Sequence, residues 1–217
     1  MSRPVVIYRW IVLLLAAGYL LRTFLFSDFS DFGGPYRFLT IWALTLSFLA
    51  ASRMMALVED RSTRRWDGFV SMVAVLNTMV VVLYWRLYFA DPTSVTRDGQ
   101  LSAWHLELYL HLVGPLLQVI DAIFLHRAFR RPLAGVAWVL GVLGAYLLWA
   151  ELLVAPRNDS PVGEVTSGLP YPFLNDLALP ERLGFYGTNV AVGLLVLGFY
   201  TAICWAVSRA SPRREAI

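Results

Sequence analysis

Six long apolar runs constrain the fold of this chain more than any other feature of its sequence. They cover roughly residues 5–26, 36–58, 69–90, 103–126, 132–154 and 184–208. A helix needs about 20 mostly apolar residues to cross the hydrocarbon core of a bilayer, and each run meets that length. Barrel strands are shorter and alternate in polarity, which these runs do not. The sequence therefore predicts an all-α polytopic membrane protein, a bundle of about six transmembrane helices in which residues 1–217 form a single transmembrane domain.

Charge content and the first run support this interpretation. Only 15% of the residues are charged, whereas a soluble domain carries roughly 25%. Little sequence is therefore left for a soluble catalytic or nucleic-acid-binding domain. The first run follows Arg3 and has a signal peptide as its competing interpretation, but signal peptides have apolar cores of about 7–15 residues and end in small residues. This run is longer and ends in Arg22-Thr23-Phe24-Leu25-Phe26, so we expect an uncleaved first helix.

The basic residues predict the orientation of the bundle. All 18 are arginine, which excludes mechanisms based on a lysine Schiff base. With the N-terminus in the cytoplasm, twelve arginines fall on the cytoplasmic side and six on the other, in agreement with the positive-inside rule. The twelve are Arg3, Arg9, Arg53, Arg61, Arg64, Arg65, Arg127, Arg130, Arg131, Arg209, Arg213 and Arg214, and the six are Arg22, Arg37, Arg86, Arg97, Arg157 and Arg182. We therefore expect both termini to be cytoplasmic and no nucleic-acid partner. Basic residues that are all arginine are typical of a GC-rich genome, which favours an integral protein of a bacterial inner (plasma) membrane.

The one long segment expected outside the cytoplasm is the outer loop, residues 155–183. Its centre, Gly168-Leu169-Pro170-Tyr171-Pro172-Phe173-Leu174, is rich in proline and aromatic residues. A loop of this length without a periodic pattern is often functional. It can serve either as a lid over a pocket or as a cap packed on the helix ends.

Polar residues at membrane depth are costly and are therefore candidates for function. In the fourth run, the helical period of 3.6 residues places Trp104, Glu107, His111, Pro115 and Gln118 along one stripe that should face the bundle interior. Pro115 has no N–H for the carbonyl of His111 and can kink the helix there.

Three other runs contribute Thr40, Asn77 and Asn189. Thr40 and Asn189 can converge with Glu107 and His111 in the outer half of the bundle. Each also has a structural interpretation, because a threonine in a membrane helix usually bonds its own backbone and an asparagine often bonds a neighbouring helix. The sequence alone leaves both interpretations open.

The histidines limit the chemistry. A bis-histidine haem needs ligands on two facing helices, but His105, His111 and His126 all lie in the fourth run. A zinc site needs three or four ligands, and only Glu107 lies near these histidines in the sequence. We therefore expect no metal and no cofactor. What remains is a hydroxyl with a histidine: a neutral His111 can take the proton of the Thr40 hydroxyl if the two groups lie within about 3 Å.

Three motifs give the chain a resemblance to a known family. They are Phe32-Gly33-Gly34-Pro35-Tyr36-Arg37-Phe38-Leu39-Thr40, then His111-Leu112-Val113-Gly114-Pro115 running on to Asp121, and Leu169-Pro170-Tyr171-Pro172-Phe173-Leu174 followed by Asn189. In these motifs and in the order of its runs, the chain resembles the androgen-induced and androgen-dependent TFPI-regulating family of six-span membrane proteins and its bacterial relatives. The resemblance covers nearly the whole length. It implies a threonine hydrolase that splits fatty acid esters of hydroxy fatty acids, with Thr40 as the nucleophile and His111 as its histidine.

The chain departs from the family pattern at two places. After Thr40 the sequence Ile41-Trp42-Ala43-Leu44 is apolar, and Leu108 stands where the animal members have a second histidine. The other site residues are expected to support the pair. They are Glu107, which would orient the imidazole; Asn77 or Asn189, which would polarise the ester carbonyl; and Tyr171, which would cover the pocket.

The function we expect is hydrolysis of a lipid or fatty-acyl ester by an enzyme surrounded by membrane lipids. One alternative is a transporter, channel or lipid-binding protein that uses the same polar cavity, because Gln118 and Asp121 extend the polar residues of the fourth run inward. Another is a scaffold whose buried polar groups only fix helix packing. In that structural role, Asp121 would cap polar groups or pair with an arginine such as Arg53 or Arg127.

Overall fold

The computed structural model describes residues 2–96 and 102–210, and its long elements are all helices. Within these residues, six helices are long and apolar enough to cross a membrane, which confirms the predicted all-α fold with six candidate spans. They are α1 (Arg3–Phe26), α2 (Leu39–Val58), α3 (Asp67–Ala90), the composite helices Trp104–Leu125 and Pro132–Arg157, and α8 (Leu179–Ala210). Arg97, Arg213 and Arg214, used above for the orientation, lie outside the described residues.

The two composite helices contain π-helical turns. The first is built from α4 (Trp104–Leu108), the π turn η3 (Tyr109–Val113), α5 (Gly114–Ile120) and the π turn η4 (Asp121–Leu125). The second is built from α6 (Pro132–Trp149), the π turn η5 (Ala150–Val154) and the 3₁₀ turn η6 (Ala155–Arg157). A π turn is wider than an α turn and often occurs at functional sites. His111 lies within the first of these turns.

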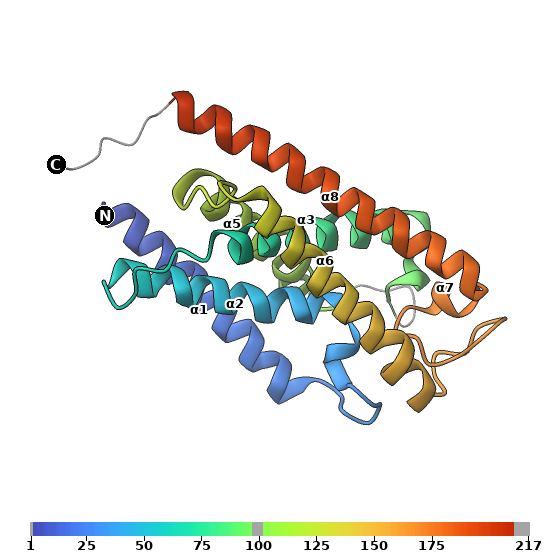
Figure 1. Ribbon diagram of the computed structural model, residues 1–217. Helices are drawn as coiled ribbons and strands as arrows, with labels where there is room; N and C mark the ends of the chain where they lie inside the picture. Colours follow the sequence, from blue (N-terminus) through green and yellow to red (C-terminus); the bar gives the residue numbers. More distant parts are fainter. Residues whose placement is uncertain (1, 97–101, 211–217) are drawn as a thin grey trace.

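The central helix of the bundle is α3, which packs against α2, α5, α6 and α8 (Figure 1). Helices α1 and α8 lie on the outside and turn large apolar side chains outward; Leu14 is 62% exposed and Leu195 is 72% exposed. Such exposure is stable in hydrocarbon rather than in water. The start of α1 and the end of α8 lie at the same end of the bundle (Figure 1), while their cytoplasmic orientation stays a prediction.

Three of the predicted boundaries differ from the structure by three residues or more. The fifth helix ends at Arg157 rather than at residue 154. The second helix begins at Leu39 rather than at residue 36, because Gly33 (φ 89°) and Gly34 (φ 47°) adopt the left-handed region and lead into the short 3₁₀ turn η1 (Gly34–Arg37). The last helix begins at Leu179 rather than at residue 184, and the Glu181 carboxylate accepts the N–H of Ala178 at its start. The outer loop is accordingly shorter than predicted and holds the short helix α7 (Pro172–Asn175).

The predicted inward face of the fourth span is mostly right. Glu107, His111, Pro115 and Gln118 are buried, whereas Trp104 is 74% exposed. Trp104 is the first residue of α4, at a span end where indoles commonly face the membrane interface.

Asp121 is paired with Arg9, not with Arg53 or Arg127. The Nε and Nη2 atoms of Arg9 donate to the two carboxylate oxygens of Asp121, each at 2.9 Å, and both residues are buried. The hydroxyl of Tyr8 also donates to the carbonyl of Leu117 at 2.6 Å. These contacts hold α1 against the second half of the fourth span. The correct partner was not expected because it lies 112 positions away in the sequence.

We expect Asp121→Ala to destabilise the protein by about 3–5 kcal/mol, because it removes the carboxylate that balances the buried Arg9 charge. The double variant Arg9→Met/Asp121→Leu should recover most of that loss, since an apolar pair of similar volume buries no charge. Thermal unfolding of the detergent-solubilised variants measures both effects, with the exposed Asp159→Ala as control. A loss for Asp121→Ala no larger than for Asp159→Ala would contradict this role of the pair.

Candidate active site

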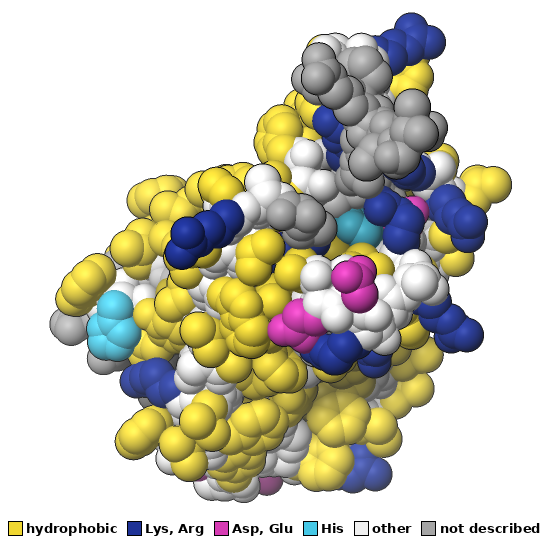
Figure 2. Space-filling model, turned by 90° about the vertical axis from the view of Figure 1, so that its left-hand side faces the viewer, with side chains coloured by type: hydrophobic (Ala, Val, Ile, Leu, Met, Phe, Trp, Pro, Cys, Tyr) yellow, Lys and Arg dark blue, Asp and Glu magenta, His cyan; other side chains and the backbone are white. Residues whose placement is uncertain are grey.

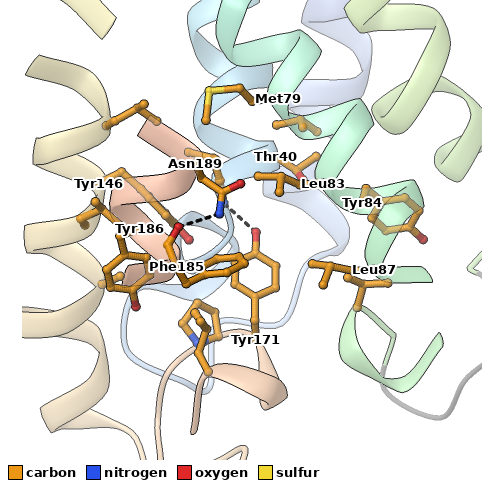
Figure 3. A pocket seen from close by; sticks show the side chains of 18 of the residues that line it. Thr40, Met79, Leu83, Tyr84, Leu87, Tyr146, Tyr171, Phe185, Tyr186 and Asn189 are labelled. Atoms are coloured by element: carbon orange, nitrogen blue, oxygen red, sulfur yellow. Dashed lines mark hydrogen bonds between the residues drawn. The ribbon is translucent and has the colours of Figure 1, made fainter. Parts of the chain in front are cut away.

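A cavity lies between α2, α3, α6, α8 and the 170–174 segment (Figure 3). We call it the main cavity. Its wall is mostly leucine, valine, phenylalanine and other apolar side chains. The polar side chains of the wall are Thr40, Tyr84, Tyr146, Tyr171, Tyr186 and Asn189. An apolar chamber with a few polar groups suits a long hydrocarbon ligand that carries one polar function.

Thr40 stands in the first turn of α2, and its hydroxyl differs from those of the other helical threonines. A helical threonine commonly bonds the carbonyl four residues earlier. For Thr40 that carbonyl belongs to Tyr36, which already accepts the indole N–H of Trp42 at 2.9 Å and of Trp149 at 3.1 Å. Within residues 2–96 and 102–210, the hydroxyl of Thr40 has no hydrogen-bond partner. By contrast, the carbonyl four residues earlier is bonded by Thr23, Thr45, Thr78, Thr188 and Thr201.

The start of α2 also supplies backbone donors beside this hydroxyl. The N–H of Leu39 donates to the hydroxyl of Tyr171 at 3.2 Å, and the N–H of Thr40 has no acceptor in the part of the chain that the structure describes. The first N–H groups of a helix lie at the positive end of its dipole. A free N–H next to an uncommitted hydroxyl is a suitable donor for an oxyanion.

His111 is held in the π turn η3 by Glu107 and Tyr84. Its Nδ1 lies 2.9 Å from Oε2 of Glu107, and the hydroxyl of Tyr84 donates to the same oxygen at 2.6 Å. The rings of Tyr84 and His111 are stacked, with centroids 3.4 Å apart and planes 4° from parallel. The other Glu107 oxygen accepts the N–H of Ser102 at 3.1 Å. A carboxylate on Nδ1 fixes the tautomer with the proton on that nitrogen and leaves Nε2 as the basic atom.

The backbone at His111 is fixed as well. Pro115 lacks the N–H that an α-helix would supply to the carbonyl of His111, as the sequence predicted. The indole N–H of Trp85 on α3 donates to that carbonyl at 2.9 Å. The histidine is therefore anchored to α3 through its backbone and through the Tyr84 ring.

Thr40 and His111 lie on neighbouring elements but are not joined by a hydrogen bond among the described residues. The residues that line the main cavity include Tyr84 but not His111. Thr40 also borders a smaller void, together with Gly114 and Pro115 of the histidine's own helix. Tyr84 thus links the cavity wall to the imidazole. Proton transfer between the threonine and the histidine therefore requires a bridging water or a movement that brings the two groups together.

The two asparagines are placed differently. Asn77 donates both amide hydrogens, to Ser47 Oγ and to the carbonyl of Val73, each at 2.8 Å. It lines the smaller void rather than the main cavity. Asn189 lines the main cavity and donates to the carbonyl of Phe185 at 2.8 Å (Figure 3), which uses one of its two amide hydrogens.

Tyr171 points into the main cavity from the loop (Figure 3). Burial raises the pKa of its hydroxyl, so the group stays neutral while it accepts the N–H of Leu39. The loop is held by the buried Asn175, whose side chain bonds both the N–H and the carbonyl of Leu169. The backbone carbonyl of Asn175 also accepts two N–H groups, those of Val165 and Thr166. The loop is thus an ordered wall of the cavity.

Sequence reasoning missed two parts of this site. Tyr84 follows Asn77 by seven residues and so shares its helix face, but no pattern indicates that its ring stacks on His111. Glu151 was also missed, although an acid near the end of an apolar run is a signal in itself. Its carboxylate accepts hydrogen bonds from the Tyr186 hydroxyl at 2.7 Å and from Nε–H of Arg182 at 2.9 Å. These bonds fix Tyr186 in the cavity wall.

Comparison with known proteins gives one match. Residues 6–205 match the family model described as FAR-17a/AIG1-like protein. This range runs from α1 into α8 and includes all three motifs on which the resemblance was based. No curated protein and no solved structure matches the chain.

Proposed function

The chain belongs to the FAR-17a/AIG1-like family, and from this premise we propose that it hydrolyses lipid esters, with Thr40 as the acylated nucleophile and His111 as the base. Family membership supports a hydrolase, and the six candidate spans make the protein integral to a membrane. The observation that carries the proposal is the Thr40 hydroxyl, which no described residue engages and which borders a mostly apolar cavity. We assign the protein to a bacterial inner membrane, with both termini in the cytoplasm.

In the first half of the reaction, the Thr40 oxygen attacks the ester carbonyl carbon while Nε2 of His111 takes the hydroxyl proton through a bridging water, because the two side chains are not hydrogen-bonded to each other. The tetrahedral intermediate collapses, and the alkoxide leaves with the proton from His111. Water then attacks the threonine ester, His111 again takes and returns a proton, and the carboxylic acid is released with Thr40 restored. Glu107 holds the proton on Nδ1 throughout, so Nε2 alternates between base and acid.

The oxyanion needs at least one donor close to the attacking oxygen. The backbone N–H of Thr40 is the first candidate, since it has no acceptor among the described residues and lies at the start of α2. The second amide hydrogen of Asn189 is the other candidate. Asn77 is less suitable, because both of its amide hydrogens are already donated.

The apolar wall of the cavity favours a substrate with a long hydrocarbon chain. A fatty acid ester of a hydroxy fatty acid fits this description, because its ester carbonyl is flanked by acyl chains. The residues at Leu83, Leu87 and Phe173 line the space where such chains would lie. Substrate would come from the surrounding membrane lipids.

The alternative function, a transporter, is less well supported than a hydrolase. The reason lies in the second half of the fourth span. There, Gln118 donates to the carbonyl of Ser47 at 3.3 Å, and Asp121 is bonded to Arg9. The polar residues that would extend a conducting path inward are therefore engaged in helix-to-helix contacts.

A fluorophosphonate probe tests the proposal on the purified protein. We expect a single adduct on Thr40, located by mass spectrometry, and no adduct in Thr40→Ala. Thr45→Ala is the matched control, because Thr45 lies on the same helix but does not line the main cavity; its labelling should be normal. Well-folded wild-type protein that is not labelled at residue 40 would overturn the proposal.

A further inference from the structure

A second hollow lies at the other end of the bundle from the main cavity. It is an open depression formed by the α2–α3 connection and the starts of α3 and α6. We call it the arginine hollow, after Arg64, Arg65 and Arg131 in its wall. These elements lie at the end of the bundle where α1 begins (Figure 1). Figure 2 faces this end and shows dark blue arginine side chains distributed over a largely yellow, apolar surface.

The charge of the arginine hollow is unbalanced. Asp67 is the one acid in its wall, and it is already engaged, with Arg65 at 3.1 Å and with Nε2 of His126 at 3.0 Å. Arg65 also donates to the carbonyl of His126 at 2.7 Å. Arg64 and Arg131 are exposed, and their side chains have no ion pair, hydrogen bond or ring contact with the described residues. Two guanidinium groups are therefore available to an anion in the same hollow.

The position of the hollow indicates what kind of anion reaches it. Its wall includes the indoles of Trp66 and Trp138, which are 39% and 42% exposed. Trp66 directly precedes α3, and Leu133, one residue into α6, is 84% exposed. Tryptophans and exposed leucines at the ends of spans mark the level of the lipid headgroups. The hollow thus opens where lipid phosphates lie.

Close packing keeps the arginines together. A Cβ atom on Gly68 would lie 2.8 Å from Cβ of Ala134, so the first turn of α3 and the first turn of α6 are in direct contact. This contact brings the segment before α3, with Arg64, and the residue before α6, Arg131, to the same hollow. Arginine forks pair well with phosphate oxygens, and each arginine near a membrane surface strengthens binding to an anionic lipid.

We propose that the arginine hollow binds the phosphate of an anionic phospholipid in the leaflet at this end of the bundle. Arg64 and Arg131 would hold the phosphate oxygens, Trp66 and Trp138 would lie beside the glycerol and upper acyl chains, and the Asp67–Arg65–His126 network would keep the wall rigid. This site is independent of the proposed hydrolase, because it shares no residue with the main cavity.

Native mass spectrometry of the purified full-length chain tests the proposal. Protein is equilibrated with equal amounts of phosphatidylglycerol and phosphatidylcholine that carry the same acyl chains. We expect wild-type protein to retain phosphatidylglycerol preferentially and Arg64→Gln/Arg131→Gln to bind it about 30-fold more weakly, which corresponds to about 2 kcal/mol at 1.4 kcal/mol per tenfold.

The matched control is Arg61→Gln/Arg130→Gln, which removes the same charge from the same end. Both of these arginines are exposed and neither lines the hollow, so phosphatidylglycerol retention should stay within about threefold of wild type. Equal losses in the two double variants, or no loss in Arg64→Gln/Arg131→Gln, would refute the site. Displacement of the lipid by millimolar inorganic phosphate would refute the choice of a lipid as its ligand; we expect none. Matching elution profiles in size-exclusion chromatography confirm that the variants are folded.

Discussion

Thr40→Val is expected to lower hydrolysis of a long-chain fatty-acyl ester by about 1,000-fold or more, because the variant has no oxygen to acylate. The same substitution should leave the unfolding temperature almost unchanged. Valine has nearly the shape of threonine, and the lost hydroxyl makes no hydrogen bond to any described residue. Thr40→Ser should keep a measurable fraction of the turnover, since it retains the nucleophile.

The control is Thr45→Val, for which we expect a loss of stability but no loss of turnover. Thr45 bonds the carbonyl of Ile41 at 2.8 Å and meets the Tyr36 hydroxyl at 3.0 Å, so its replacement should reduce stability slightly and leave turnover near wild type. Product release from detergent-solubilised protein, followed by mass spectrometry, gives the rates. Turnover of Thr40→Val within tenfold of wild type would show that another group is the nucleophile.

His111→Gln is expected to reduce turnover by about 100- to 10,000-fold, the usual contribution of a positioned general base. Glutamine retains a hydrogen-bond donor toward Glu107 but cannot cycle a proton at neutral pH. In His111→Gln, labelling of Thr40 by the fluorophosphonate probe should fall together with turnover, because the threonine would no longer be activated. Glu107→Gln should give a smaller loss and a changed pH profile, since Glu107 orients the ring without touching the substrate.

His105→Gln serves as the comparison for His111→Gln. His105 lies six residues earlier in the same span, is exposed, and lines neither the main cavity nor the smaller void. Its replacement should change turnover by less than about twofold. A similar loss in both variants would point to a general effect on the helix rather than to loss of a base.

The parts of this fold that follow from the bilayer could be predicted from the sequence alone. Each span must be long and apolar, so the six runs predict the six helices closely, and the four-residue spacing of Glu107 and His111 predicts that they meet. The helix boundaries that were predicted wrongly depend on local features of the chain. The start of α2 depends on two left-handed glycines, and the start of α8 lies within the proline-containing loop where no apolar run marks it.

Partners that come from distant helices could not be predicted. Arg9 meets Asp121 across 112 positions, and no rule of spacing selects it over Arg53 or Arg127. The stacking of Tyr84 on His111 also depends on how α3 and the fourth span face each other. For Thr40, the sequence left open whether the hydroxyl bonds its own backbone. It makes no such bond, and two indoles already occupy the carbonyl of Tyr36.

Because those two indoles bond the Tyr36 carbonyl, the start of α2 does not need the Thr40 hydroxyl for its folding. Trp42 comes from the same helix and Trp149 from α6. Together they supply the hydrogen bonds to this carbonyl that a helical threonine ordinarily supplies. Residue 40 can therefore change during evolution, and its chemistry with it, at little cost to the stability of the bundle. Conversely, we expect a change at either tryptophan to let the Thr40 hydroxyl bond the carbonyl of Tyr36. The proposed activity would then be lost although Thr40 and His111 were both still present.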